Sequence, residues 1–158
     1  MKNKINIFLS LLLGFVGGVF IKTKHFTLQL NKAKVDSDKH LILFLMMNQW
    51  VKIKQDGINI SEYFERKKYY NVAIYGMSYV GQTLVKELDN TKIKVVYGID
   101  ENKDNIYADI DIFAKEDPLK KVDVVVVTAV TFFDEIEKEL HKIIDCPIVS
   151  LGDILFEY

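Results

Sequence analysis

Apolar residues change their pattern twice along this chain. Residues 5–21 form one nearly continuous apolar run, and residues 41–53 carry apolar positions at helical spacing. From residue 71 onward, short apolar runs alternate with segments that are apolar at every third or fourth position. Short apolar runs are typical of strands covered on both faces, and the wider spacing is typical of amphipathic helices. The pattern therefore predicts an α/β domain over residues 71–158, with helical segments before it.

The alternation after residue 71 predicts both the elements and their order in the sheet. We expect strands at residues 71–75, 93–99, 110–113, 123–130 and 147–151, helices at residues 80–88 and 132–140, and a short tail from Gly152 to Tyr158. About ten residues separate the second and third strands, whereas a crossover that contains a helix needs about a dozen or more. The sequence therefore predicts a loop there and a five-stranded, mostly parallel Rossmann-like sheet with strand order 3-2-1-4-5.

Two helices are predicted ahead of the first strand. The first begins after a cap at Ser37 or Asp38, extends to about Gln55 and ends at Gly57, and the second spans Ile60–Lys67. Apolar residues cover more than one stripe of the first helix: Leu41, Ile42, Phe44, Leu45, Met46, Trp50, Val51 and Ile53. Such a helix must dock on another surface. That surface belongs either to its own domain or to a partner subunit.

The apolar run at residues 5–21 is a candidate membrane anchor. Its seventeen residues, at about 1.5 Å each, reach about 25 Å, which is near the lower limit for spanning a bilayer. A secretory signal peptide shares the basic start and apolar core, but no Ala-x-Ala-like cleavage site follows. We therefore predict an uncleaved transmembrane helix with basic flanks over residues 1–24, a linker over 25–37 and a helical lead-in over 38–70.

Lysine residues set the predicted orientation of this anchor. Four lysines follow the apolar run within residues 22–34, whereas two lysines and the amino terminus precede it. The positive-inside rule then places the C-terminal body in the cytoplasm, as part of a single-pass protein of the cell membrane. The lone Cys146 allows no disulfide within the chain and agrees with a reducing compartment.

Ser10, Gly14 and Gly18 recur at every fourth position of the apolar run. They either form a small-residue face on which two anchors pack as a homodimer, or reflect how common glycine is in membrane helices. Both interpretations remain open.

Charge is divided unevenly along the chain and bears on the partners. Residues 1–56 hold nine lysines and three aspartates, net +6, whereas residues 57–158 carry net −7. A basic segment beside an apolar run favours the headgroups of membrane lipids. The acidic domain argues against a nucleic-acid partner, because binding a phosphate backbone needs clustered lysines and arginines.

The stretch from Asn71 to Gly81 predicts a strand, a tight glycine loop and a helix. In dinucleotide-binding folds the first glycine makes the turn, the second lets the backbone approach a pyrophosphate, and the third lets the helix pack on the strand. Gly76 and Gly81 fit the first and third roles, but Ser78 stands where the second glycine is expected. The expected cofactor-binding residues of this loop are Gly76, Met77, Ser78, Tyr79, Val80 and Gly81.

Further candidate binding residues follow the second and fourth predicted strands. Asp100 comes 24 residues after Gly76, near the spacing of about 20 at which an acidic residue binds a ribose hydroxyl and repels a 2′-phosphate. The alternative is an ordinary turn residue, since a polar loop follows it. Thr128 and Ala129 end the fourth strand, where Thr128 can donate a hydroxyl contact, and Thr131 is expected to cap the next helix.

The sequence offers few groups for catalysis. None of the three histidines, His25, His40 and His141, follows a predicted strand, so no general base is expected over the crevice. Metal-ligand spacing, a nucleophile elbow and a P-loop lysine are all missing from the sequence. We therefore expect no metal and assign no catalytic residue.

Three stretches together resemble the small Rossmann-like domains of bacterial surface-polysaccharide biosynthesis proteins, which bind NAD(P) or nucleotide-sugars. They are residues 72–81, the Tyr-Gly-Ile-Asp sequence that ends at Asp100, and residues 123–129. The likeness extends over roughly residues 58–158. It implies that Gly76, Ser78, Gly81 and Asp100 contact a nucleotide, with NAD or a nucleotide-sugar as ligand.

Three functions follow as hypotheses. The leading one is a membrane-anchored cytoplasmic domain that binds a nucleotide or nucleotide-sugar as an accessory to cell-envelope polysaccharide synthesis, alone, as a homodimer or with a synthesis partner. The second is a ligand-free protein-interaction adaptor that uses the Leu41–Ile53 helix as its docking face. The third is an NAD-dependent enzyme subunit completed by a partner that carries the catalytic groups.

Overall fold

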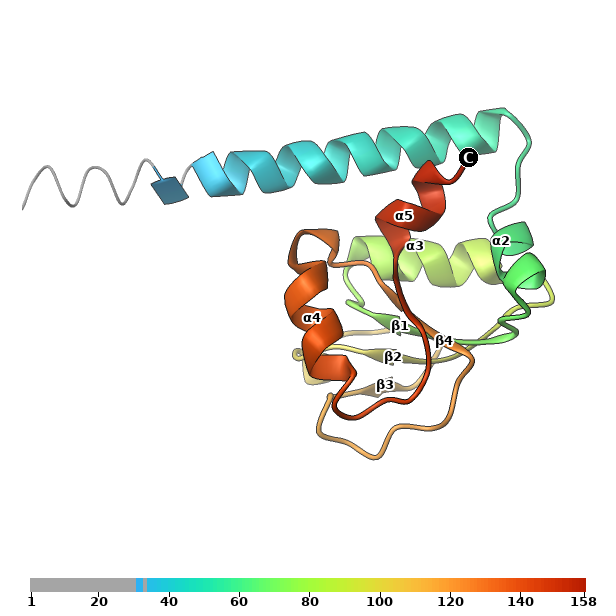
Figure 1. Cartoon of the computed structure of the whole chain (residues 1–158), viewed down its shortest axis with the longest axis vertical. Helices are drawn as coiled ribbons and strands as arrows, with labels where there is room; N and C mark the ends of the chain where they lie inside the picture. Colours follow the sequence, from blue (N-terminus) through green and yellow to red (C-terminus); the bar gives the residue numbers. More distant parts are fainter. Residues whose placement is uncertain (1–30, 33) are drawn as a thin grey trace, which may run out of the picture. The chain divides into compact units, whose positions relative to one another are not determined.

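The computed structural model describes residues 31–32 and 34–158 (Figure 1). The predicted anchor at residues 1–24 lies outside these residues. The chain divides into two compact units, Met1–Phe44 and Leu45–Tyr158. Within the described residues, the structure contains no helix that combines the length and apolar character needed to cross a bilayer.

A single sheet of five parallel strands forms the centre of the second unit (Figure 1). The strands are β1 (Asn71–Tyr75), β2 (Lys94–Ile99), β3 (Ile112–Phe113), β4 (Val124–Val127) and β5 (Ile148–Ser150). Their order is β3-β2-β1-β4-β5, and all four neighbouring pairs are parallel. The predicted α/β class and strand order are confirmed.

Two helices connect strands, another comes directly before the first strand, and another follows the last. They are α2 (Ser61–Lys67), α3 (Tyr79–Leu88), α4 (Phe133–Leu140) and α5 (Leu151–Phe156), with short 3-10 turns η1 (Lys103–Asn105) and η2 (Val130–Phe132). Between β2 and β3 the structure has only η1, so the predicted loop crossover is confirmed. The fourth strand is shorter than predicted because the chain turns into η2 immediately after Thr128 and Ala129.

The two faces of the sheet are buried by different helices. On one face, Ala73, Val125 and Val127 pack in a cluster with Ile136 and Leu140 of α4. The alternate residues of β1 and β4 point to the other face, and they are fully buried as well: Val72, Ile74, Val124 and Val126. The amphipathic helix α3 covers this face. Burial on both faces explains why β4 is a continuous valine run instead of an alternating strand.

The predicted C-terminal tail is a helix. Ser150 caps α5, because its Oγ accepts a hydrogen bond from the Gly152 amide at 3.2 Å. Leu151, Ile154 and Leu155 of α5 are fully buried. The prediction of a tail was wrong, because a segment this short shows no clear helical periodicity. Its burial against the domain stabilises the helix.

The helix before α2 begins earlier than predicted and ends where predicted. Residues 34–36 are already helical, so Ser37 and Asp38 lie inside the helix and do not cap it. No glycine or proline interrupts the preceding residues. At the other end, Gly57 has φ +73°, and the amides of Gly57 and Ile58 donate to the carbonyls of Lys54 and Ile53. This pattern is a Schellman cap.

Within the second unit, residues 45–55 of this helix pack on the α/β domain. Met46, Trp50 and Ile53 are buried, at the spacing of one helix face. The Gln49 side chain donates a hydrogen bond to the Leu155 carbonyl at 3.2 Å, and Lys54 forms an ion pair with Glu87 of α3 at 2.8 Å. The docking face therefore covers the chain's own domain, while Leu45 and Val51 stay exposed.

The start of α3 packs unusually close to the end of β1. Gly76 has φ +91°, a backbone conformation that side chains rarely adopt, and turns the chain out of the strand. Gly81 faces back onto that turn, where a Cβ atom at position 81 would overlap the Gly76 carbonyl oxygen. The predicted roles of Gly76 in the turn and of Gly81 in helix packing both agree with this geometry.

We predict that Gly81→Ala destabilises the domain by about 1–3 kcal/mol or more, because the added methyl group meets backbone and not a movable side chain. The free energy of unfolding in urea measures the effect. Gly152→Ala is the control, since its nearest atom would be the Ser150 Oγ at 3.4 Å, an ordinary contact. Equal stability of the wild-type protein and Gly81→Ala would contradict the close packing described above.

At the opposite end of the sheet, Asp123 ties the starts of β1 and β4 together. Its Oδ2 accepts hydrogen bonds from the Tyr70 amide at 2.9 Å and from the Asn71 amide at 2.7 Å. The Asn71 hydrogen bond is the main cause that holds the pKa of Asp123 below its usual value. Because the folded-state pKa is the lower one, the stabilisation is present above the unfolded pKa of about 3.9 and is lost as the pH falls through the folded pKa.

We therefore expect Asp123→Asn to lower the urea midpoint at pH 7, and the difference from wild type to shrink as the pH falls below about 4. Urea titrations of both proteins between neutral and acidic pH measure this. Asp104→Asn removes a carboxylate from an exposed loop and is the control. A difference that stays constant down to the lowest pH would show that ionised Asp123 contributes nothing to stability.

Candidate functional site

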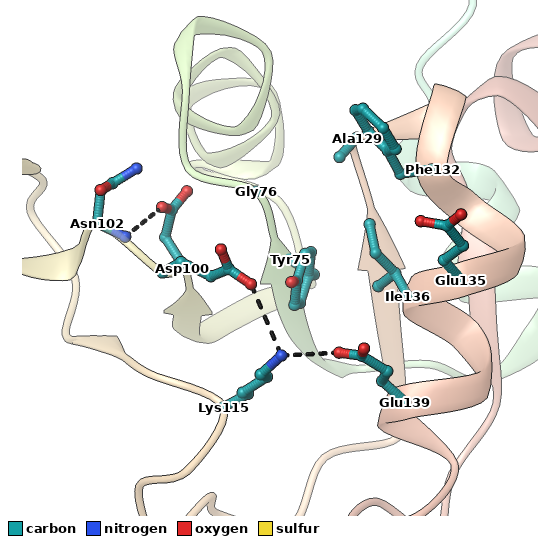
Figure 2. Close-up of a pocket in the computed structure, with 11 residues that line it drawn as sticks. Tyr75, Gly76, Asp100, Asn102, Lys115, Ala129, Phe132, Glu135, Ile136 and Glu139 are labelled. Carbon is teal, nitrogen blue, oxygen red and sulfur yellow. Dashed lines mark hydrogen bonds and ion pairs between the residues drawn. The ribbon is translucent and has the colours of Figure 1, made fainter.

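A cavity of about 360 Å³ opens at the carboxyl ends of the strands (Figure 2). Tyr75 is the last residue of β1, and Gly76 comes directly after it. Asp100 comes directly after β2, and Ala129 lies shortly after β4. The remaining lining residues come from the loops after β2 and β3 and from the α4 region: Glu101, Asn102, Lys115, Phe132, Glu135, Ile136 and Glu139. Because β1 lies between β2 and β4, this is the switch point of the sheet, where ligands of open α/β folds bind.

The glycine loop beside this cavity is held by the protein's own groups. The Gly76 amide donates to the Ile99 carbonyl at 2.9 Å, and the Gly76 carbonyl accepts from the Thr128 hydroxyl at 2.6 Å. The Met77 amide donates to Asp100 Oδ2 at 2.8 Å, and the Met77 carbonyl accepts from the Gln82 side chain at 3.3 Å. Each polar backbone group of Gly76 and Met77 thus has a partner within the domain.

Met77 anchors the loop from inside. Its side chain is fully buried and fills the space above Gly98 of β2, where a Cβ atom would lie 2.6 Å from Met77 Cγ. Gly98 is therefore needed for this packing. Ser78 next to it is exposed, and its extended backbone, φ −68° and ψ −166°, suits any residue. The position of the missing second glycine thus needs no glycine in this conformation.

Asp100 joins the tip of β2 to the loop and also faces the cavity (Figure 2). Its Oδ2 accepts from the Met77 amide, and its Oδ1 accepts from the Asn102 amide at 2.9 Å. A carboxylate offers about four lone-pair positions. Two positions therefore remain for a ligand after both backbone bonds are made.

The cavity is lined by more negative than positive charge. The carboxylates are those of Asp100, Glu101, Glu135 and Glu139, and the single cation among these described lining residues is Lys115. Lys115 forms ion pairs with Glu139 at 2.7 Å and with Glu101 at 3.6 Å (Figure 2). The hydrogen bond to Glu139 raises the pKa of Lys115 and lowers that of Glu139, so both are charged at neutral pH.

Tyr75 stands in the middle of the cavity, between the β2 tip and α4 (Figure 2). Burial, followed by the charge of Glu101, raises the pKa of its phenol. The Tyr75 phenol is therefore protonated at neutral pH, where it can donate a hydrogen bond but cannot accept a proton as a general base. Its ring, Phe132 and Ile136 supply the apolar part of the lining.

The structure separates the residues predicted from sequence into two groups. Gly76, Asp100 and Ala129 line the cavity. Met77, Gly81 and Thr128 are buried, Val80 is half-buried, and Ser78 and Tyr79 are exposed outside the lining. Thr128 uses its hydroxyl inside the fold, and Thr131 lies within η2 and does not cap α4, so the capping prediction was wrong.

Sequence reasoning missed Tyr75, Lys115 and the α4 residues of the lining. Glu135 and Glu139 are four positions apart after the strongest predicted strand. Phe132 precedes Glu135 by three positions, and Ile136 lies between the two glutamates. That spacing places all four on one side of a helix that starts beside the switch point. This was the signal that could have identified them.

Another cavity lies between α3 and residues 106–109, with a volume of about 500 Å³. Met77, Gln82 and Lys86 are among its lining residues. None of the lining residues is the last residue of a strand. Within residues 31–32 and 34–158, no group of three or more His, Cys, Asp or Glu side chains is placed to hold a metal ion. The cavity at the switch point therefore remains the candidate site.

Fold and site together define a small parallel α/β domain with an acidic cavity at its switch point. The family model described as C2185-like, N-terminal matches residues 68–147, about half of the chain, and the chain belongs to this family. The matched segment begins just before β1 and ends just before β5, so it contains the loop and the cavity. No curated protein and no solved structure matches the chain.

Proposed function

We propose that the switch-point cavity binds a ligand that contains a ribonucleoside, with the ribose hydroxyls on Asp100. The observation that carries this proposal is the geometry of Asp100, whose carboxylate is fixed by the Met77 and Asn102 amides and still faces the cavity. The two lone-pair positions that remain match the two hydroxyls of a ribose. Tyr75, Phe132 and Ile136 offer an apolar wall for a base.

NAD and nucleotide-sugars, the ligands that the resemblance implies, belong to this ligand class. The membrane anchor, the cytoplasmic location and the accessory role in polysaccharide synthesis complete the proposal, and they depend on the sequence pattern and on the resemblance alone. An NAD-dependent enzyme subunit whose catalytic groups come from a partner stays a prediction as well. In this chain Tyr75 is protonated at neutral pH and offers a hydrogen-bond donor but no base.

Calorimetric titration of the full chain in mild detergent tests the proposal. The ligands are NAD, NADP, a panel of nucleotide-sugars and the parent nucleosides. We expect at least one to bind saturably and Asp100→Ala to weaken it about tenfold or more, because a hydrogen bond to a charged group contributes about 1.5–3 kcal/mol. NADP should bind more weakly than NAD, since its 2′-phosphate meets Asp100.

Two controls make this test specific. Asp104→Ala removes a carboxylate from the same loop but outside the cavity lining, and should bind like wild type. A 2′,3′-dideoxy analogue of the bound ligand should lose affinity for wild type and show no further loss with Asp100→Ala. If none of the nucleosides or nucleotides binds, the proposal is wrong.

A second candidate function is protein interaction through residues 45–55. An apolar groove of about 350 Å³ runs between this helix and α3, and Met47, Trp50 and Val51 contribute to its lining. Val51 is 52% exposed, which leaves its side chain available to a partner such as a second copy of the chain.

If the groove closes on a second copy, Val51→Lys should convert a dimer to a monomer in sedimentation equilibrium. Ile143→Lys is the matched control, because Ile143 is also 52% exposed and lies outside the groove. A wild-type protein that is monomeric at all concentrations, or a dimer unaffected by Val51→Lys, would exclude this arrangement.

A further inference from the structure

One backbone amide of the glycine loop is already used by a carboxylate. In dinucleotide-binding folds the pyrophosphate lies at the N-terminus of the helix after this loop, where the second glycine lets the backbone approach it. Here the Met77 amide, directly after Gly76, donates to Asp100 at 2.8 Å. Met77 cannot easily turn away, because its side chain is fully buried against Gly98. The Met77 amide is therefore not free for a ligand phosphate, and Asp100 adds a negative charge beside the loop.

The first residues of α3 lie outside the cavity lining. The first helical hydrogen bond of α3 runs from the Gln82 amide to the Ser78 carbonyl at 3.0 Å, so the preceding amides have no acceptor within the helix. Gly76 belongs to the cavity lining, but neither Ser78 nor Tyr79 does. A ligand seated in the cavity therefore gains little from the start of α3.

The side chains of the cavity also disfavour a phosphate. Four carboxylates face one lysine, and two of those carboxylates already neutralise Lys115. Glu135 projects from α4 toward the cavity, on the side opposite Asp100 (Figure 2). A diphosphate would meet carboxylates from β2 and from α4 alike, whereas hydroxyls, amino groups and cations would find hydrogen-bond acceptors.

The volume of the cavity is compatible with a ligand the size of a nucleoside. About 360 Å³ lies near the lower end of the range of about 300–1,000 Å³ for small-molecule sites. A nucleoside is a ligand of that scale, and a dinucleotide would extend into solvent.

We propose that the ligand of this site is a ribonucleoside without phosphate, either neutral or carrying a positive charge on its 5′ substituent. This inference rests on the proposed function and narrows it to one ligand class, which excludes NAD and nucleotide-sugars because both carry a diphosphate. The ribose hydroxyls bind Asp100, the base lies against Tyr75 and Phe132, and Glu135 accepts hydrogen bonds from amino groups.

Paired titrations of the full chain test the inference. Each of adenosine, guanosine, cytidine and uridine is compared with its 5′-diphosphate and its 5′-amino-5′-deoxy analogue, which is cationic at neutral pH. For whichever base binds, we expect the nucleoside to bind at least tenfold more tightly than the diphosphate. The amino analogue should bind more tightly again, and added salt should weaken that advantage.

A charge reversal in the cavity provides an independent readout. Glu135→Lys should raise the affinity for the diphosphate relative to the nucleoside by tenfold or more. Glu116→Lys is the matched control, because Glu116 is exposed outside the lining and should leave the ratio unchanged.

The outcomes separate this inference from the proposed function. A diphosphate that binds wild type more tightly than its nucleoside, with Asp100-dependent affinity, overturns the inference and leaves the proposed function intact. A ratio that Glu135→Lys does not change also overturns it. If no nucleoside, analogue or diphosphate binds at all, the proposed function fails and takes the inference with it.

Discussion

The close contact between the first turn after β1 and the start of α3 is the constraint on which this domain depends. Gly76 must adopt a positive φ to leave the strand, and Gly81 must lack a side chain to let the helix lie on the turn. Because α3 covers one face of the sheet and β1 is its central strand, an error at this point would displace the whole covered face. The same contact fixes where the loop and the cavity meet.

The polar groups of the loop are satisfied by the domain itself. Thr128 at the end of β4 and Asp100 at the end of β2 hold the loop from both sides of β1. Three neighbouring strand ends are thereby joined without a ligand. Preorganisation of this kind lowers the cost of binding a ligand that fits, but it also removes the Met77 amide from the donors available to a phosphate. The loop is thus held in its conformation by the protein's own side chains.

Helical segments outside the sheet extend the domain. Residues 45–55 bury Met46, Trp50 and Ile53, and α5 contributes Leu155 to the same side, where its carbonyl accepts from Gln49. Both segments lie outside the residues that the C2185-like family model matches. The groove beside Val51 lies between one of these segments and α3, which is within the matched residues.

Sequence periodicity predicted the five strands, because short buried runs and glycine turns act through local geometry. The rules for parallel α/β sheets then predicted their order. The spacing of glycines also placed Gly76 in the turn and Gly81 at the contact between helix and strand, as the structure has them. The ribose contact of Asp100 stays a prediction. Tertiary structure decided the rest. Leu151–Phe156 became a helix because its burial offsets the weak propensity of a short segment. The charge of the cavity also depends on the tertiary structure. Glu101, Lys115 and Glu139 come from three separate segments that meet only in the folded domain, and no local sequence pattern shows that they pair.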